Sequence, residues 1–379
     1  MRIRLGTFNV ENLVTRHAFP PPGQGQFANR GDGDAALSLF QFPRPGEREA
    51  VERSLTVMLE DDKRQATALA IAEAHADIWI LQEVDSLASL QAFFANYVHR
   101  VSDHRYGHFT LIEGNDRRGI DVGFAMRRDL VDPQALTIHS HAQATFQDLG
   151  VYDDDLAAMG RKPNDRVFQR DCLETEIDFG GTHFTVFGCH FKSMNNGKDN
   201  GKGNGRQATL PLRRAEAMAV RRIIQERFGA GWRGANWVIA GDLNGYRHGL
   251  GFAAKPLDEG LSGIETLTDN FAHDVMQSQP EHERWTHFRR YWSESEGRML
   301  EVHMPLDHVL MSPALAAANP QPKIDLVRRG LPYRVPLDPR KADRSIATLA
   351  TTGDRYPRIG WDRPKASDHC PMVVTLELP

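Results

Sequence analysis

Trp-Val-Ile-Ala-Gly-Asp-Leu-Asn, residues 237–244, joins a short apolar run to a polar turn. The apolar residues 237–240 are typical of a buried strand. Residues 241–244 follow at once, and glycine, aspartate and asparagine are frequent turn formers. The stretch therefore predicts a buried strand that ends in a turn, with the polar side chains of Asp242 and Asn244 at its end.

The same arrangement recurs along the chain, because several strand-like runs end in polar or titratable residues. These residues are Asn9, Glu83, His190, Asp242, Asn244, Asp307, Asp368 and His369. Hydrophobic periodicity predicts strands at 2–10, 77–82, 120–126, 172–177, 182–191, 237–240, 306–311 and 372–378, and helices at 61–75 and 212–228. In a layered sheet protein, the ends of such strands can converge on one rim.

The order of these elements is mixed and does not repeat a strand–helix–strand unit, so we expect helices covering sheets in an α/β protein. We interpret residues 1–379 as a single domain. Three segments interrupt the regular pattern and are predicted to be insertions on one core: 15–48, 195–206 and 320–364. Within the first, residues 19–42 form either a lid or substrate wall near Asn9 or a passive surface loop.

Composition excludes several classes of protein. The net charge of −4 argues against a generally basic nucleic-acid binder, although local basic loops can still steer a phosphate chain. The three cysteines are widely spaced and indicate buried thiols rather than a disulfide framework or a zinc knuckle. No apolar run is long enough for a membrane span. The N-terminus lacks the pattern of a secretory leader, so we expect a cytoplasmic protein unless a leader has already been removed.

The strand-end residues suit the hydrolysis of a phosphodiester, which needs a cation on the phosphate oxygens, a base for water and donors for the developing charge. Hard cations such as Mg²⁺ prefer carboxylate and amide oxygens. Each signal taken singly also has an ordinary structural interpretation. Residues 241–244 could be a plain turn, and residues 367–369 a polar loop. Glu83 could be a strand-end carboxylate, and His190 a core histidine. Their occurrence together, in this order, favours a catalytic site.

The joint pattern closely resembles the endonuclease/exonuclease/phosphatase superfamily, which has the DNase I-like fold. The resemblance rests on motifs that span nearly the whole chain: 7–13 (TFNVENL), 81–84 (LQEV), 118–123 (RGIDVG), 190–193 (HFKS), 241–244 (GDLN), 306–310 (LDHVL) and 367–371 (SDHCP). The implied fold is a four-layer sandwich, with two stacked mixed β-sheets flanked by helices.

The resemblance also implies a role for each matched residue. Asn9 and Glu83 would hold the metal, and Asp368 would contribute to the metal or water site. Asp242 and Asn244 would orient the nucleophilic water and the scissile phosphate. The expected cofactor is Mg²⁺ or Mn²⁺, with one or two ions left open.

Two histidine–aspartate pairs are implied on either side of the phosphate. His369 would contact the phosphate and be oriented by Asp307, and His190 would lie opposite with Asp121 as its carboxylate partner. A carboxylate beside a histidine selects one tautomer and stabilises the cation. Either one histidine donates a proton to the leaving oxygen, or both stabilise charge.

Differences between this chain and other branches of the superfamily reduce the number of expected substrate classes. Abasic-site endonucleases usually carry a Tyr and an Asn where this chain has residues 190–193, and inositol polyphosphate 5-phosphatases carry a Trp-Cys-Asp-Arg block where this chain has 305–308. The His190 pattern is shared with DNase I-like nucleases and sphingomyelinase-like phosphodiesterases. The start of this motif, the loop after it and the Arg-rich helix beyond are most similar to the bacterial extracellular-nuclease-like branch.

Basic residues near these motifs are predicted to bind substrate: Arg118, Lys192, Lys198, Lys202 and Arg206. A basic loop beside a phosphate site can follow a nucleic-acid backbone, and a solvated Gly-rich connector is an equally good interpretation. His282, His287 and His303 are predicted to be surface or packing residues, and Trp285 and Phe288 core or loop anchors rather than base-stacking groups.

The resulting expectation is a metal-dependent phosphodiester hydrolase, with nucleic acid as the first choice of substrate. The alternatives are a phosphatase or lipid phosphodiesterase that uses the same site and, third, a binding protein on a catalytically dead scaffold. No obligate protein partner is inferred.

Overall fold

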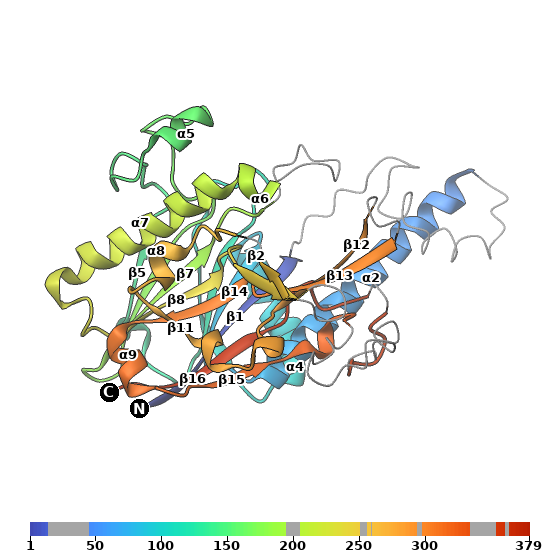
Figure 1. The fold of residues 1–379 in the computed structure, drawn as a ribbon. Helices are drawn as coiled ribbons and strands as arrows, with labels where there is room; N and C mark the ends of the chain where they lie inside the picture. The colour runs from blue at the N-terminus through green and yellow to red at the C-terminus, as the bar shows by residue number, and fades with distance from the viewer. Residues whose placement is uncertain are drawn as a thin grey trace.

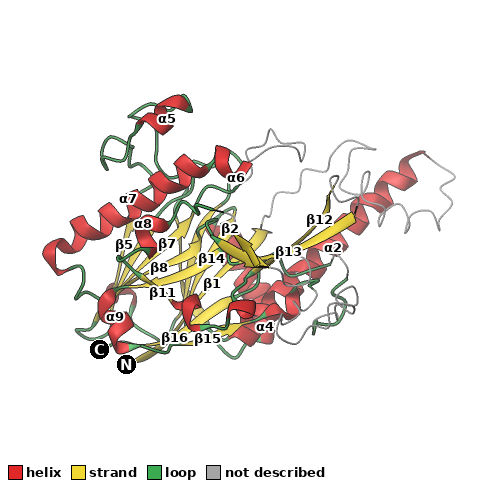
Figure 2. Ribbon diagram, viewed as in Figure 1, coloured by secondary structure: helices red, strands yellow, loops and turns green. Residues whose placement is uncertain are grey.

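The computed structural model describes residues 1–13, 45–194, 205–250, 256–258, 260–293, 298–333, 354–360 and 364–379. Two six-stranded sheets stack face to face, and helices cover their outer faces. Figures 1 and 2 show α7 along one outer side of the stack and α2 on the other. The predicted four-layer α/β sandwich is confirmed.

The first sheet has the order β15-β16-β1-β2-β4-β3. Its strands are β15 (Lys323–Leu326), β16 (Met372–Glu377), β1 (Arg2–Leu13), β2 (Ile78–Val84), β4 (Asp121–Arg127) and β3 (Tyr106–Leu111). The sheet is mixed, because β1 runs parallel to β2 and antiparallel to β16. Its centre therefore carries two parallel strands whose carboxyl ends reach the same rim.

The second sheet has the order β11-β14-β8-β7-β6-β5. Its strands are β11 (His273–Asp274), β14 (Asp307–Met311), β8 (Trp237–Asp242), β7 (His183–His190), β6 (Leu173–Asp178) and β5 (Leu136–Ser140). The parallel pair is β7 with β8, and β14 runs antiparallel to β8. Each sheet therefore has a pair of parallel strands at its centre.

The space between the sheets is filled by aliphatic side chains from both inner faces. Ile80 and Val122 of the first sheet meet Val186 and Val238 of the second, and all four are fully buried. Burying each such side chain stabilises the fold by about 1.5–3 kcal/mol. Gly188 lies where the sheets come close, since a Cβ there would be 3.1 Å from Cγ2 of Ile80. This packing holds the carboxyl ends of both parallel pairs at one edge.

Two long helices close the outer faces. Helix α7 (Leu210–Phe228) confirms the predicted helix and packs small residues such as Ala217 against Phe187 and Ile239 of the second sheet. Helix α2 (Pro45–Ala74) begins well before the predicted residue 61 and packs Ala70 and Ala74 against the first sheet. Residues 45–48, which were assigned to an insertion, are therefore helical.

The remaining α-helices of the described residues are short: α3 (Leu87–Phe93), α4 (His99–Val101), α5 (Asp154–Ala158), α6 (Gly205–Ala208), α8 (Glu265–Thr268) and α9 (Pro313–Ala318). Of the predicted insertions, residues 15–44, 195–204, 334–353 and 361–363 lie outside the described part of the chain. The prediction of an insertion across 320–364 was wrong at its start, because β15 pairs with β16 as the edge of the first sheet.

A four-stranded sheet was not predicted from the sequence. Its order is β10-β9-β13-β12, built from β10 (Pro256–Asp258), β9 (His248–Leu250), β13 (Arg298–Met304) and β12 (His287–Ser293). In Figures 1 and 2 the β12–β13 pair projects from the side of the sandwich. The first residue of β12 bridges to His369 near the C-terminus, so this sheet is anchored beside the ends of the central strands.

Candidate active site at the rim of the two sheets

Three titratable side chains stand side by side where the second sheet ends. Asp242 is paired in register with His190 of β7 on one side and with Asp307 of β14 on the other. All three are buried. Nε2 of His190 lies 3.5 Å from Oδ2 of Asp242. The register of three adjacent strands therefore assembles the centre of the site.

Gly241 permits the close approach of β8 to β7. Its φ of +152° is rarely adopted by other residues, and a Cβ there would lie 1.8 Å from the carbonyl oxygen of Cys189. The next turn is also constrained: Asn244 has a φ of +49°, and its backbone N–H donates to Oδ1 of Asp242 at 2.9 Å. The 241–244 turn therefore orients Asp242 from both sides.

Asn9 connects the first sheet to this centre. Its Nδ2 donates to Oδ2 of Asp242 at 3.0 Å, and its Oδ1 accepts from the N–H of Glu11 at 3.0 Å. The hydroxyl of Ser367 donates to the carbonyl of Asn9 at 2.7 Å. The structure thus brings together the 7–13, 241–244 and 367–371 motifs, which are far apart in the sequence.

The predicted pairing of His369 with Asp307 is present. Nδ1 of His369 lies 2.7 Å from Oδ2 of Asp307, and Nε2 of His369 lies 3.9 Å from Oδ2 of Asp242. The hydroxyl of Thr286 accepts the backbone N–H of Asp307 at 3.1 Å. Since Asp307 holds Nδ1, Nε2 is the ring atom that points toward Asp242.

The predicted pairing of His190 with Asp121 is not found. Oδ1 of Asp121 instead accepts the N–H of Gly114 at 2.8 Å, and within the described residues no hydrogen bond or ion pair joins this carboxylate to His190. Asp121 starts β4 in the first sheet, whereas His190 ends β7 in the second. The carboxylate that approaches His190 is Asp242.

The two histidines have opposite electrostatic character. Burial lowers the pKa of His190 well below its ordinary value, and the positive charge of Arg170 adds to this shift. Burial also lowers the pKa of His369, but the carboxylates around it, Asp307 foremost, together raise the pKa of His369 to about 10. At neutral pH the site therefore combines a neutral imidazole with an imidazolium cation.

The carboxylates of the site destabilise one another's charge. Burial raises the pKa of Asp242 to about 7, with Asp307 adding to the shift and His369 opposing it. Burial, and then the charge of Asp368, raise the pKa of Glu11. In the described part of the chain, Oε2 of Glu11 and Oδ1 of Asp307 are buried with no hydrogen-bond partner. Such excess negative charge on oxygen fits a hard divalent cation.

Glu83 lies at a strand irregularity. The pairing of β2 with β4 shifts register between Gln82 and Val84, and Glu83 between them has a φ of +67°. A bulge of this kind redirects one side chain out of the regular alternation of a strand. With Asn9 and Asp368, Glu83 supplies the type of oxygen donor that the predicted metal requires.

The predicted substrate-binding residues differ in their surroundings. Arg118 and Lys192 lie close enough to His190 for their positive charges to lower its pKa. The exposed guanidinium of Arg118 also pairs with Asp116, and the amine of Lys192 donates to Ser193. Arg206 lies in α6, and its guanidinium donates to the carbonyls of Tyr246 and Leu261 and covers the ring of Tyr246. The binding capacity of Arg206 is therefore largely used within the protein. Lys198 and Lys202 lie outside the described residues.

His287 belongs to the site although its sequence context predicted a surface or packing residue. Its Nε2 lies 3.5 Å from Oδ2 of Asp368, and its ring meets the ring of His369 edge-on at a centroid distance of 4.6 Å. Burial would raise the pKa of Asp368, but the hydrogen bond from His287 and the charge of Lys365 hold it well below its ordinary value. No local signal indicated this, because the contact depends on the unpredicted sheet.

The neighbouring aromatic residues match their predicted packing roles. Trp285 and Phe288 are buried in a small cluster with Leu250, Leu331 and Cys370. They form the hydrophobic base of the sheet that carries His287. This cluster therefore fixes the position of β12 against the sandwich.

A hydrogen-bonded histidine stabilises the turn behind Asp242. Nδ1 of His308 contacts Oδ2 of Asp274 at 3.0 Å, and its Nε2 contacts the carbonyl of Gly245 at 2.9 Å. Burial lowers the pKa of His308, but Asp274, the carbonyl of Gly245 and Asp307 together make the net direction upward. The ring thus joins β11 and β14 to the end of the 241–244 turn.

His308→Phe is expected to lower the free energy of unfolding by about 2–4 kcal/mol, because it leaves a buried carboxylate and a buried carbonyl without their partner. The raised folded pKa makes the charged pair's contribution complete below the unfolded value of about 6.5 and lost as pH rises through the folded value. Urea unfolding at about pH 6 and about pH 9 should therefore show the larger difference at the lower pH. His139→Ala, at an exposed position of β5, is the control; equal stability of His308→Phe and the native chain would contradict the assignment.

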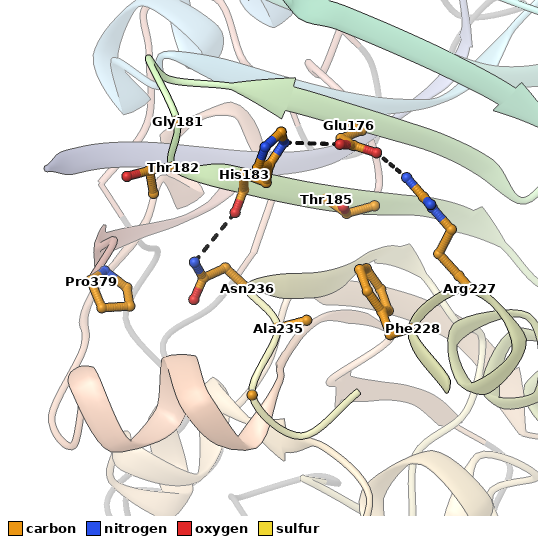
Figure 3. A pocket seen from close by; sticks show the side chains of 11 residues that line it. Glu176, Gly181, Thr182, His183, Thr185, Arg227, Phe228, Ala235, Asn236 and Pro379 are labelled. Carbon is orange, nitrogen blue, oxygen red and sulfur yellow. Dashed lines mark hydrogen bonds and ion pairs between the residues drawn. The ribbon is translucent and has the colours of Figure 1, made fainter. Parts of the chain in front are cut away.

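A cavity of about 480 Å³ lies at the opposite end of the second sheet, near the start of β7 and β8 (Figure 3). Its polar groups are paired with one another: His183 and Arg227 both contact Glu176, and Asn236 donates to the carbonyl of His183. The eight residues of β7 separate this cavity from His190 by about 23 Å at the usual rise of a strand. It is therefore separate from the rim site.

Several solved structures align with this chain at low sequence identity. No curated protein sequence matches the chain. Solved structures that align with it include an endonuclease/exonuclease/phosphatase family protein from Bacteroides thetaiotaomicron, with 12% identity, a TM-score of 0.49 and coverage of 100% of this chain and 98% of that one. A mannosyl-6-phosphatase from the same organism aligns with 12% identity, a TM-score of 0.49 and 99% coverage of both chains. D. rerio TDP2 complexed with a single-strand DNA product aligns with 14% identity, a TM-score of 0.46 and 99% coverage of both chains.

Among the described residues, no helix is both long and apolar enough to cross a membrane. The family model named Endonuclease/Exonuclease/phosphatase family matches residues 7–369, from the first site motif to the last. The match contains every residue of the rim site, from Asn9 to His369. The chain therefore belongs to the endonuclease/exonuclease/phosphatase family, whose members hydrolyse phosphoesters.

Proposed function

We propose that this protein is a Mg²⁺- or Mn²⁺-dependent phosphodiester hydrolase that cleaves nucleic acid. The observation that carries the proposal is the position of Asp242, whose Oδ2 lies 3.5 Å from Nε2 of His190 and 3.9 Å from Nε2 of His369. One carboxylate thus faces both a neutral and a cationic imidazole at the rim of the sandwich. This arrangement can accept a proton on one side and stabilise negative charge on the other.

Asn9, Glu83 and Asp368 are the residues proposed to hold the cation. When bound there, a divalent cation would neutralise phosphate oxygens and lower the cost of bringing an anion to this acidic rim. The fit rests on the donor chemistry, since these three residues offer amide and carboxylate oxygens, and on the buried unpartnered carboxylate oxygens beside them.

Side chains of this protein carry out the proton transfer, the orientation of the water and the stabilisation of charge. Asp242 accepts a proton from the attacking water, and a carboxylate with a pKa near 7 is well matched to that role at neutral pH. Asn244 orients the water and the phosphate. As the bond from phosphorus to the leaving oxygen breaks, the imidazolium of His369 stabilises the charge or gives its Nε2 proton to that oxygen, and Asp307 holds the ring in place.

Nucleic acid is the first choice because Arg118 and Lys192 lie on the His190 side of the site, where a phosphate backbone could continue beyond the scissile bond. A second candidate is the hydrolysis of a small phosphoester or a lipid phosphodiester. The contacts of Arg206 favour it, since carbonyls of the protein already occupy that guanidinium. The two candidates share the chemistry and differ in what binds beside it.

A substrate panel separates these candidates. The full chain is offered plasmid, single-stranded DNA, RNA, sphingomyelin vesicles and p-nitrophenyl phosphate, each with Mg²⁺ or Mn²⁺. We expect kcat/KM for at least one nucleic acid to exceed that for p-nitrophenyl phosphate by about tenfold or more, the size of effect that one or two additional phosphate contacts give. Turnover of the lipid or the phosphomonoester without cleavage of any nucleic acid would overturn the nuclease assignment.

A variant of one proposed binding residue tests whether nucleic acid is bound beside the site. Arg118→Ala should raise KM for nucleic acid by a few-fold and leave kcat on p-nitrophenyl phosphate unchanged, since it removes a contact remote from the bond that breaks. Arg100→Ala, on α4, is the control for the loss of a positive charge. An equal effect of Arg118→Ala on both substrates would place this residue in the chemical step instead.

A further inference from the structure

The start of β12 is built into the rim by its backbone. His287 forms an isolated bridge with His369. The N–H of Phe288 donates to the carbonyl of Asp368 at 3.2 Å, and the N–H of Cys370 donates to the carbonyl of Thr286 at 2.8 Å. These bonds flank His369 on both sides. The position of the His287 side chain is therefore set by the main chain and not by a flexible loop.

Three potential ligand atoms converge at this bridge. His287, Asp368 and His369 each offer one, and these atoms all lie within 4.8 Å of one another. Opposite ligands bound at about 2.1 Å from one cation lie about 4.2 Å apart, and adjacent ones lie closer. The separation of 3.5 Å between Nε2 of His287 and Oδ2 of Asp368 is already in that range. Small side-chain rotations would bring all three onto one ion.

The surroundings support metal binding at this cluster. His287 is 7% exposed, and its Nδ1 has no hydrogen-bond partner within the described residues. Asp307 holds Nδ1 of His369 at 2.7 Å, the carboxylate–histidine arrangement that orients a metal ligand through its other ring nitrogen. The side chain of Asp368 is 36% exposed, so solvent reaches the cluster on one side.

We propose that His287, Asp368 and His369 form a second cation site, which binds a transition-metal dication such as Zn²⁺ in preference to Mg²⁺. Two imidazoles and one carboxylate favour such ions, whereas the oxygen donors of Asn9 and Glu83 favour Mg²⁺. Binding takes the neutral form of His369, so each ion bound displaces the Nε2 proton to solvent. This inference rests on the proposed function, because the site shares Asp368 with the proposed magnesium site. It also uses Nε2 of His369, the atom assigned to the leaving oxygen, so an ion bound there would inhibit hydrolysis.

The test is metal binding by the full chain without substrate. Zn²⁺ and Mg²⁺ binding are measured by calorimetry, and Co²⁺ binding by its visible absorption, for the native chain, His287→Phe and His139→Ala. We expect His287→Phe to weaken Zn²⁺ and Co²⁺ binding by about tenfold or more, as one lost ligand costs, and to change the Co²⁺ spectrum. Mg²⁺ binding should be unchanged, and His139→Ala should match the native chain.

His287→Gln keeps the test valid if His287→Phe does not fold, because the amide preserves polarity at the same place. Equal Zn²⁺ affinity and equal Co²⁺ spectra in a folded His287 variant and the native chain would overturn the second site and leave His287 as a packing partner of His369. Activity with Mg²⁺ is measured separately. If Zn²⁺ binding does not depend on His287 but phosphoesters are hydrolysed, the second site is refuted and the proposed function stands. If Zn²⁺ binding depends on His287 but no phosphoester is hydrolysed, only the proposed function is refuted.

Discussion

Asp242→Asn is expected to lower kcat for phosphodiester hydrolysis by about 10³-fold or more, because it removes both the proposed proton acceptor and the negative charge that faces His369. The amide has the shape of the carboxylate. Its oxygen can still accept the N–H of Asn244, so the 241–244 turn should keep its geometry. The loss should therefore fall on kcat, with little change in KM. The new amide nitrogen faces Nδ2 of Asn9, which loses its acceptor, so the melting temperature should fall slightly.

The measurement is steady-state hydrolysis of bis(p-nitrophenyl) phosphate together with thermal unfolding. Asp155→Asn is the matched control, since this carboxylate lies in α5 with a side chain that is 60% exposed. It removes the same charge outside the site and should leave kcat unchanged. Near-normal turnover in Asp242→Asn, with unchanged metal dependence, would show that the catalytic centre lies elsewhere.

His369→Ala should lower kcat by about 10²–10³-fold, the usual cost of losing one group that stabilises charge in the transition state. Asp307→Asn should cost somewhat less, because it leaves the imidazole present and removes the carboxylate that holds Nδ1 at 2.7 Å and raises the pKa of His369. The two residues act through one imidazolium. The double variant should therefore be no slower than His369→Ala alone.

The pH profile adds an independent readout for this pair. Asp307→Asn removes the largest influence that raises the pKa of His369, so the fraction of charged His369 should begin to fall at a lower pH than in the native chain. The alkaline limb of kcat against pH should move to lower pH accordingly. Additive losses in the double variant, with an unmoved alkaline limb, would mean that Asp307 does not work through His369.

Most elements of the sandwich were predictable because their signals are local. The alternation in β1 and β7, the apolar run of β8 and the helical spacing of α7 depend on residues within a few positions of one another. Apolar periodicity reports which side of an element is buried, and these elements are buried on well-defined faces. The start of α2 was missed because its first turns are only weakly amphipathic. The strand β15 was missed because it lies in a stretch rich in Pro and Arg.

The site was only partly predictable, and Asp121 shows why. The family resemblance implied Asp121 as the partner of His190, but the two residues belong to different sheets. Which carboxylate meets His190 depends on the register of β7 and β8, which places Asp242 directly beside it. A motif names the residues of a site but does not state which of them touch.

The role of His287 in the site could not be predicted from the sequence. It reaches Asp368 and His369 through β12, a strand of the small sheet, and through backbone bonds to residues more than 70 positions away. No periodicity near residue 287 reports such a contact, since the pairing of distant strands is decided by the packing of the whole chain.

By itself the sequence determined the layered α/β fold, the family and the residues that gather at the rim, because strand patterning and motif order are properties of the linear chain. Only the tertiary structure decided that Asp242 lies between a neutral and a cationic histidine, that Asp121 turns to Gly114 and that His287 joins the cluster. The physical reason is that charge states and ligand distances arise from burial and strand register, which exist only once the two sheets have packed together.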